Sequence, residues 1–246
     1  MKKKTILSLG LAVMFTAPMM VGCGKEGKVS ESEVHTIASV ANTDEALEVL
    51  KSGNKRFVEG DMKNLDLGPE RREHLADGQS PHTIVVACSD SRVTPEHVFD
   101  QGLGDLFVIR VAGNILSEEE IGSIEYAVDH LDSPLVVLMG HESCGAVTAA
   151  VDASSGEGGN STKNIDAILN RIEPAVVKAK ESDENLAGKE LVEKSIDENI
   201  SLALSNLTDN SELVVDKMKD GNLKIIGAKY KLDTGKVEFD EFYKLD

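Results

Sequence analysis

The chain has 246 residues, 41% of them hydrophobic, which is enough to bury one large core or two smaller ones. Its formal net charge at pH 7 is -17, from 43 acidic residues against 26 Lys and Arg. Such an acidic body repels phosphate backbones and anionic lipid surfaces, which argues against nucleic acid or a charged membrane surface as its partner. The composition also argues against a disordered chain or a repeat array.

The first 23 residues have the outline of a bacterial export signal. Three lysines at positions 2–4 precede an apolar run over 6–21. The tetrapeptide at 20–23, Met-Val-Gly-Cys, resembles a bacterial lipobox, although methionine stands where leucine is usual. We therefore expect a signal peptide over 1–23, lipidation of Cys23, and an extracytoplasmic protein anchored to the bacterial cell membrane on its periplasmic or cell-surface side. An uncleaved anchor helix and cleavage without lipidation are the alternatives, but the run is short for a bilayer span.

The folded body is expected to begin shortly after a linker. Residues 24–42 are polar and aperiodic, which predicts a flexible tether. Apolar side chains then recur at helical spacing, at Ala46, Leu47, Leu50 and Phe57. These predict a helix capped by Thr43 or Asp44 and ending near Gly60. Since no change of composition divides the remainder, we expect one domain over 43–246.

Four short apolar runs predict buried strands. They are Thr83–Ala87, Leu106–Val111, Leu135–Met139 and Leu223–Ala228, and Gly140 is expected to stop the third. Glu118–His130 has a helical pattern, and the Asp-Thr-Gly turn within Lys231–Phe239 predicts a hairpin. Strands that alternate with helices indicate an α/β fold, with a mainly parallel central sheet flanked by helices and a C-terminal edge hairpin.

Two polar segments follow the first and third predicted strands, at the sheet edge where α/β proteins bind ligands. After the first strand, an extended chain would place Cys88, Asp90 and Arg92 on one side. Arg92 would then keep the Asp90 carboxylate ionised and orient it through charge-assisted hydrogen bonds. After the third strand, the three-residue step from His141 to Cys144 predicts a chelating pair on one side of a helical first turn.

Two thiols, an imidazole and a carboxylate at the ends of separate strands predict a zinc site, because thiolates combined with nitrogen select zinc among the common metals. A disulfide is one alternative, since Cys88 and Cys144 are the only cysteines left after Cys23. It would leave His141 and Asp90 without a role. A structural zinc is another alternative, but such sites usually have four protein ligands, often from short cysteine spacings.

Both segments resemble the signatures of the β-class carbonic anhydrases. Cys-Ser-Asp-Ser-Arg-Val is intact at 88–93, and Gly-His-x-x-Cys-Gly at 140–145. The likeness extends over residues 43–245, through Phe107-Val-Ile-Arg110 and Ser123-Ile-Glu-Tyr126. It implies a zinc enzyme that reversibly hydrates carbon dioxide to bicarbonate and a proton by attack of zinc-bound hydroxide.

The resemblance also implies roles for individual residues. Zinc would be bound by Cys88, His141 and Cys144. Asp90 and Arg92 would be catalytic: water or hydroxide takes the fourth metal position while they are paired, and Asp90 takes it when the site is closed. The substrate-binding residues implied by the plant-like branch of the family are Gln79, Phe107, Tyr126 and Gly145. In the family the active-site cleft forms at a dimer interface, which implies a homodimer or a higher homo-oligomer.

Two other functions share most of these features. A related zinc hydrolase acting on carbonyl sulfide or carbon disulfide would have the same ligands and a differently shaped pocket. A non-catalytic, surface-displayed zinc-binding protein would need the ligands alone, and Asp90 and Arg92 would then have no purpose.

Overall fold

The computed structural model describes residues 40, 42–63, 67–159 and 161–240, all of which belong to one structural unit spanning 35–246. The predicted export signal, with Cys23, and nearly all of the predicted tether lie outside the described residues. None of the helices in the described ranges is both long enough and apolar enough to cross a bilayer.

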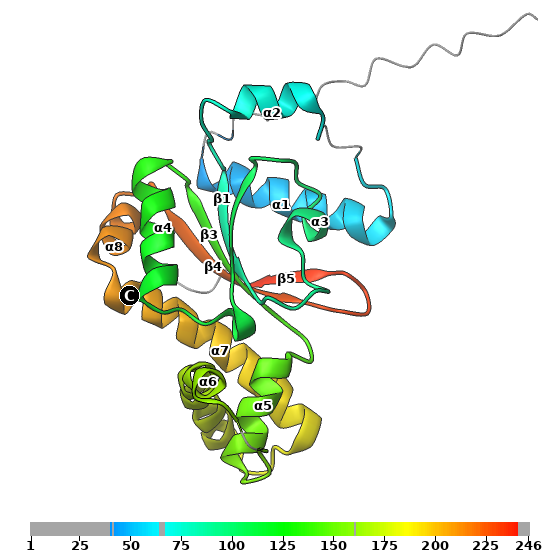
Figure 1. The fold of residues 1–246 in the computed structure, drawn as a ribbon, viewed down its shortest axis with the longest axis vertical. Coiled ribbons are helices and arrows are strands. Elements are labelled where there is room, and N and C mark those ends of the chain that lie inside the picture. Colours follow the sequence, from blue (N-terminus) through cyan, green and yellow to red (C-terminus); the bar gives the residue numbers. More distant parts are fainter. Residues whose placement is uncertain (1–39, 41, 64–66, 160, 241–246) are drawn as a thin grey trace, which may run out of the picture. The chain divides into compact units, whose positions relative to one another are not determined.

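A single sheet runs through the described part of the chain (Figure 1). Its strands are β1 (Thr83–Ala87), β2 (Leu106–Arg110), β3 (Leu135–His141), β4 (Lys224–Tyr230) and β5 (Val237–Asp240). Their order is β2-β1-β3-β4-β5, and all neighbours are parallel except β4 and β5. This confirms the predicted α/β fold, with a mainly parallel sheet and an antiparallel hairpin at one edge.

Helices supply an apolar core on each face of the sheet. The first core includes α1 (Thr43–Glu59) and α3 (Pro95–Val98). The second includes α4 (Glu118–His130), α5 (Gly145–Ser154), α6 (Lys163–Ser182), α7 (Gly188–Asn210) and α8 (Glu212–Lys219). Two short elements complete the description, α2 (Pro69–Leu75) and the 3-10 turn η1 (Ala112–Asn114).

The two cores explain the apolar runs of the sequence. In β1, Ile84 and Val86 belong to the core that contains α7, whereas Val85 and Ala87 belong to the core that contains α1. Successive side chains of a strand point to opposite faces, so a strand covered on both faces is apolar throughout. At the carboxyl ends of these buried strands, Cys88 after β1 and His141 at the end of β3 are themselves buried.

The first helix is capped by a different residue from those predicted. The side-chain oxygen of Asn42 accepts hydrogen bonds from the backbone N–H groups of Asp44 and Glu45, at 3.1 and 3.0 Å. Asparagine is a strong N-cap because its carbonyl satisfies N–H groups that have no partner within the helix. Helix α1 ends at Glu59, and Gly60 caps it in the left-handed conformation, with φ 71°.

Gly140 does not stop β3, which continues to His141. Gly140 pairs with Lys229 of β4. A Cβ atom at this position would lie 2.8 Å from two carbons of Ile200 on α7. The glycine is therefore needed where a helix approaches the sheet closely, and not where the strand turns.

Candidate metal centre

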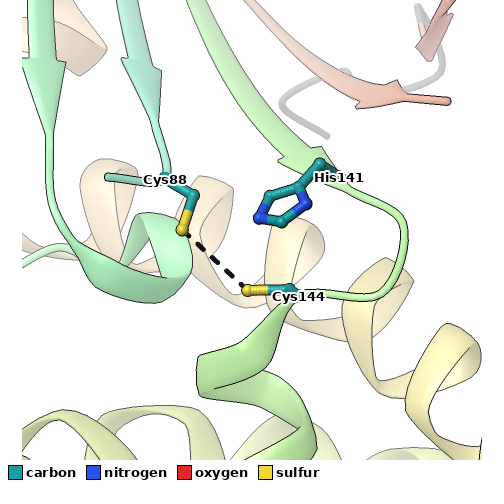
Figure 2. A group of neighbouring side chains, drawn as sticks. All are labelled: Cys88, His141 and Cys144. Carbon is teal, nitrogen blue, oxygen red and sulfur yellow. Dashed lines mark hydrogen bonds between the residues drawn. The ribbon is translucent and has the colours of Figure 1, made fainter. Parts of the chain in front are cut away.

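Three side chains meet at the carboxyl ends of β1 and β3 (Figure 2). Cys88 directly follows β1, His141 is the last residue of β3, and Cys144 is the N-cap of α5. All three are buried, at 5%, 0% and 1% exposure. Their ligand atoms all lie within 4.8 Å of one another. The structure thus brings together the three residues predicted to bind a metal.

The geometry of these atoms fits a tetrahedral metal. The two sulfurs are 4.0 Å apart, and two thiolates on one zinc ion, each about 2.3 Å from it, would lie roughly 3.8 Å apart. His141 Nδ1 is 2.9 Å from the Glu142 carbonyl oxygen, which can only accept, so Nδ1 carries the proton. The other ring nitrogen, Nε2, is buried and has no hydrogen-bond partner in the described part of the chain. A buried lone pair beside two thiols is suited to binding a cation.

The backbone between His141 and Cys144 is not the helical turn expected from the sequence. Ser143 has φ 51°, in the left-handed region, and α5 begins only at Gly145. The carbonyl of Cys144 accepts hydrogen bonds from the backbone and the side chain of Thr148, which starts the helix at the ligand itself. Gly145, a predicted substrate contact, is exposed beside Cys144 with open space around it.

The two thiols affect each other's ionisation. The hydrogen bond from Cys144 lowers the pKa of Cys88 far below its ordinary value. His141 and the backbone N–H of Gly113, which is 3.3 Å from the sulfur, lower this pKa further, whereas burial raises it. The same hydrogen bond, together with burial, raises the pKa of Cys144. The pair therefore retains one proton readily, and a metal ion bound by both sulfurs would displace it.

Asp90 and Arg92 form a bidentate ion pair beside the cluster. Arg92 Nε and Nη2 donate to the two carboxylate oxygens at 2.9 and 2.7 Å, and the Arg92 backbone N–H also donates, at 2.9 Å. These contacts hold the pKa of Asp90 well below its usual range, although partial burial opposes them. One Asp90 oxygen is 4.0 Å from His141 Nε2. The chain turns after Asp90, so Arg92 reaches the carboxylate through a turn and not through the alternation expected of an extended segment.

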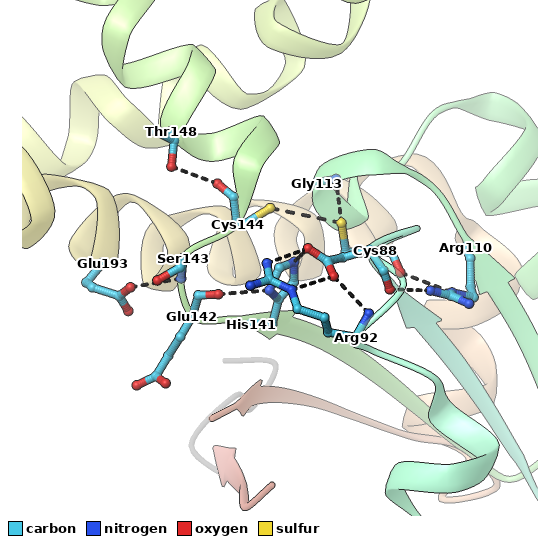
Figure 3. Close-up of polar contacts among 11 residues, drawn as sticks. Cys88, Arg92, Arg110, Gly113, His141, Glu142, Ser143, Cys144, Thr148 and Glu193 are labelled. Carbon is cyan, nitrogen blue, oxygen red and sulfur yellow. Dashed lines mark hydrogen bonds and ion pairs between the residues drawn. The ribbon is translucent and has the colours of Figure 1, made fainter. Parts of the chain in front are cut away.

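Sequence reasoning missed two residues that hold the cluster in place, of which Figure 3 shows Arg110. Arg110, at the end of β2, donates to the carbonyls of Cys88 and Asp90, at 3.1 and 2.6 Å. Asn199 of α7 is buried and donates to the carbonyl of Gly113, at 2.8 Å, whose own N–H points at the Cys88 sulfur. A charged residue ending an apolar strand was a usable signal for Arg110. Asn199 offered none, because it lies in a charged stretch that resembles a solvated helix.

The other predicted substrate contacts lie away from the metal cluster of their own chain. Gln79 is exposed and precedes β1, whereas Cys88 follows it, and five residues of strand span about 16 Å. Phe107 pairs with Ile84, near the same end of β1 as Gln79. The Tyr126 ring contacts Phe107, with centroids 6.4 Å apart. These three residues therefore lie toward the opposite end of the sheet from Cys88.

Comparisons with known proteins agree on one family. A family model described as carbonic anhydrase matches residues 83–237. Carbonic anhydrase 2 of Mycobacterium tuberculosis is 37% identical over 191 residues, which cover 78% of this chain and 89% of the relative. The solved structure of the β-carbonic anhydrase CcaA has a TM-score of 0.64 and 26% identity, covering 80% of this chain and 92% of its own. A tetrameric β-carbonic anhydrase from Sordaria macrospora has a TM-score of 0.62 and 27% identity, covering 70% and 86%.

Proposed function

We propose that Cys88, His141 and Cys144 bind a catalytic zinc ion. This chain belongs to the β-class carbonic anhydrase family, and it is a lyase that reversibly hydrates carbon dioxide to bicarbonate and a proton. The observation that carries this proposal is the convergence of two buried thiols and an unpartnered imidazole nitrogen within 4.8 Å. When bound there, zinc would supply a hydroxide nucleophile near neutral pH, because it would lower the pKa of a bound water molecule.

Asp90 and Arg92 are proposed to orient the attacking oxygen. An ionised carboxylate beside the metal ligands can accept a hydrogen bond from that oxygen and turn one of its lone pairs toward the carbon of carbon dioxide. Arg92 donates a hydrogen bond to each carboxylate oxygen of Asp90. Arg92 would thereby keep Asp90 from becoming a fourth metal ligand. The 4.0 Å approach of Asp90 to His141 leaves that closed arrangement within reach of a small side-chain movement.

Zinc content and carbon dioxide hydration, measured on the same purified protein, test this function. We expect about one zinc per chain, from the one three-residue cluster found among the described residues, and hydration that a chelator abolishes. Carbonyl sulfide and carbon disulfide should be assayed in parallel, since hydrolysis of either in preference to hydration would favour the related hydrolase. One zinc per chain with no activity on any of these substrates would favour a zinc-binding protein.

The active enzyme is proposed to be at least a homodimer, in which Gln79, Phe107 and Tyr126 complete the site of the partner chain. Two features support this. The three residues lie away from the metal cluster of their own chain, and Tyr126 is 48% exposed. In addition, β2 is an edge strand whose apolar residues are only half buried, and an exposed apolar edge favours pairing with another chain.

Mixed dimers of two inactive variants distinguish a shared site from a self-contained one. Gln79→Leu should lower the activity of its homodimer while zinc remains, and Cys144→Ser should lose zinc. If Gln79 serves the partner, coexpression of the two variants restores one complete site per mixed dimer, and activity rises to about a quarter of the wild-type value with random assortment. Mixed dimers with no more activity than the sum of the parents would assign Gln79 to its own chain. A monomeric, active wild type would exclude the shared site altogether.

The mature protein is proposed to be anchored outside the cytoplasm by a lipid on Cys23, with residues 24–42 as the tether. The support is the lipobox-like tetrapeptide after an apolar run. We expect the wild type to incorporate labelled fatty acid in a bacterial host and to sediment with membranes, and Cys23→Ala to do neither while retaining hydration activity. An unlabelled wild type found in the soluble fraction would contradict lipidation.

A further inference from the structure

Helix α7 supplies no ligand, but it bonds to two segments next to the metal ligands. On one side Asn199 donates to Gly113, whose N–H points at Cys88. On the other side the carboxylate of Glu193 accepts a hydrogen bond from the backbone N–H of Ser143, at 3.0 Å (Figure 3). Ser143 lies between two ligands, so this bond bears directly on the metal site.

Ser143 adopts a backbone conformation that a serine avoids. Its φ of 51° lies in the left-handed region, where the Cβ atom crowds the neighbouring backbone. Such a conformation persists only when surrounding contacts hold it in place. The bond to Glu193 is a long-range contact that secures the peptide N–H of this residue from 50 positions away.

Glu193 is itself fixed by the sheet. Its second carboxylate oxygen is 3.0 Å from Lys229 Nζ, on β4. Lys229 is mostly buried and also pairs with Asp197, at 2.9 Å. Burial alone would raise the pKa of Glu193, but the hydrogen bond from Ser143 and the pairing with Lys229 outweigh it and lower that pKa. An ionised, doubly held carboxylate is a strong and rigid acceptor.

Glu142, which precedes Ser143, is held by the β4–β5 hairpin. The backbone N–H of Glu142 donates to Tyr230, at 3.1 Å, and the carboxylate of Glu142 pairs with Lys231, at 3.2 Å. The carbonyl of Glu142 is the group that orients the His141 ring. The turn between the ligands is therefore held at Glu142 by the β4–β5 hairpin and at Ser143 by α7.

We propose that Glu193 is a positioning residue of the metal centre, which holds the left-handed turn at Ser143 so that His141 and Cys144 are in place before the metal arrives. This inference rests on the proposed zinc site. Glu193 would then slow the release of the metal without binding it, because an ion leaves more slowly from ligands that cannot move apart.

The test measures zinc release to an excess of chelator from Glu193→Ala, Glu193→Gln and the control Glu198→Ala. Glu198 lies on the same helix and pairs with Lys178 and Lys194, and within the described ranges it forms no ion pair with a ligand segment. We expect Glu193→Ala to release zinc about 10- to 100-fold faster than the wild type, the range typical of lost outer contacts at metal sites. Glu193→Gln should lie closer to the wild type, since its amide oxygen can still accept from Ser143. Glu198→Ala should match the wild type.

Ser143→Gly identifies the route by which Glu193 acts. Glycine tolerates positive φ, so removing Glu193 should accelerate zinc release much less in the glycine background than in the serine background. Cobalt-substituted protein gives a second readout, since a loosened site should shift the absorption bands of Glu193→Ala but not those of Glu198→Ala. Equal release rates for the two alanine variants would overturn the proposal, as would effects of Glu193→Ala and Ser143→Gly that simply add. A wild type without zinc would instead refute the metal site itself, which is a separate result.

Discussion

Cys144→Ser is expected to abolish stoichiometric zinc binding and to lower carbon dioxide hydration by a factor on the order of 10³ or more. Cys144 supplies one of three converging ligand atoms and is 1% exposed, so no other side chain can easily take its place. A serine hydroxyl does not ionise near neutral pH and is a poor ligand for zinc beside a thiolate. Elemental analysis and stopped-flow hydration measure the two losses on one sample.

Thiol titration separates the metal site from a disulfide. Cys88 and Cys144 are free in the structure. In the zinc-loaded protein we expect both to resist a thiol reagent until a chelator is added, whereas a disulfide would resist until a reductant is added. A reduced, chelated sample is the matched control, because both thiols should then react in full. Zinc retained by Cys144→Ser would contradict the proposed ligand set.

Asp90→Ala is expected to lower hydration on the order of 10²- to 10⁴-fold while the zinc content stays close to that of the wild type. Asp90 is held beside His141 by Arg92 and is not among the three converging ligands, so its loss should affect orientation of the nucleophile and not metal retention. Asp90→Asn keeps the shape of the side chain and shows whether the charge is needed. An equal loss of zinc and activity would instead make Asp90 principally a ligand.

The pH profile checks the ionisation of the same residue. Because Arg92 holds the pKa of Asp90 well below its usual value, the carboxylate stays ionised above neutrality. The Asp90–Arg92 pair and the stability it contributes are lost only in acid, as pH falls through that lowered pKa. Two thiolates would give the metal more negative charge than imidazoles do, which would raise the pKa of a water molecule bound to it. Hydration is therefore expected to rise from neutrality to about pH 9, even though Asp90 is already ionised. A flat profile over that range would contradict bound water as the titrating group.

The sequence alone predicted the sheet because a strand that is buried on both faces consists of a continuous run of apolar residues. The run from Ile84 to Ala87 is apolar throughout since helices cover both of its faces, and β3 is buried in the same way, whereas the edge strand β2 is only half buried. Side chains with metal-binding chemistry then follow two of these strands. Their convergence could be expected before any coordinates, because parallel strands end at one edge of a sheet.

Tertiary structure decided what holds those side chains in place. The left-handed turn at Ser143 and the need for glycine at position 140 depend on how closely α7 approaches the sheet, a distance that no local pattern records. Glu193 and Asn199 lie in a charged helix whose sequence suggests only a solvated surface. Glu193 nevertheless bonds to Ser143, between two ligands, and Asn199 bonds to Gly113, whose N–H points at Cys88. Residue chemistry therefore identified the metal ligands, whereas their positioning depends on contacts between residues 50 and 86 positions apart.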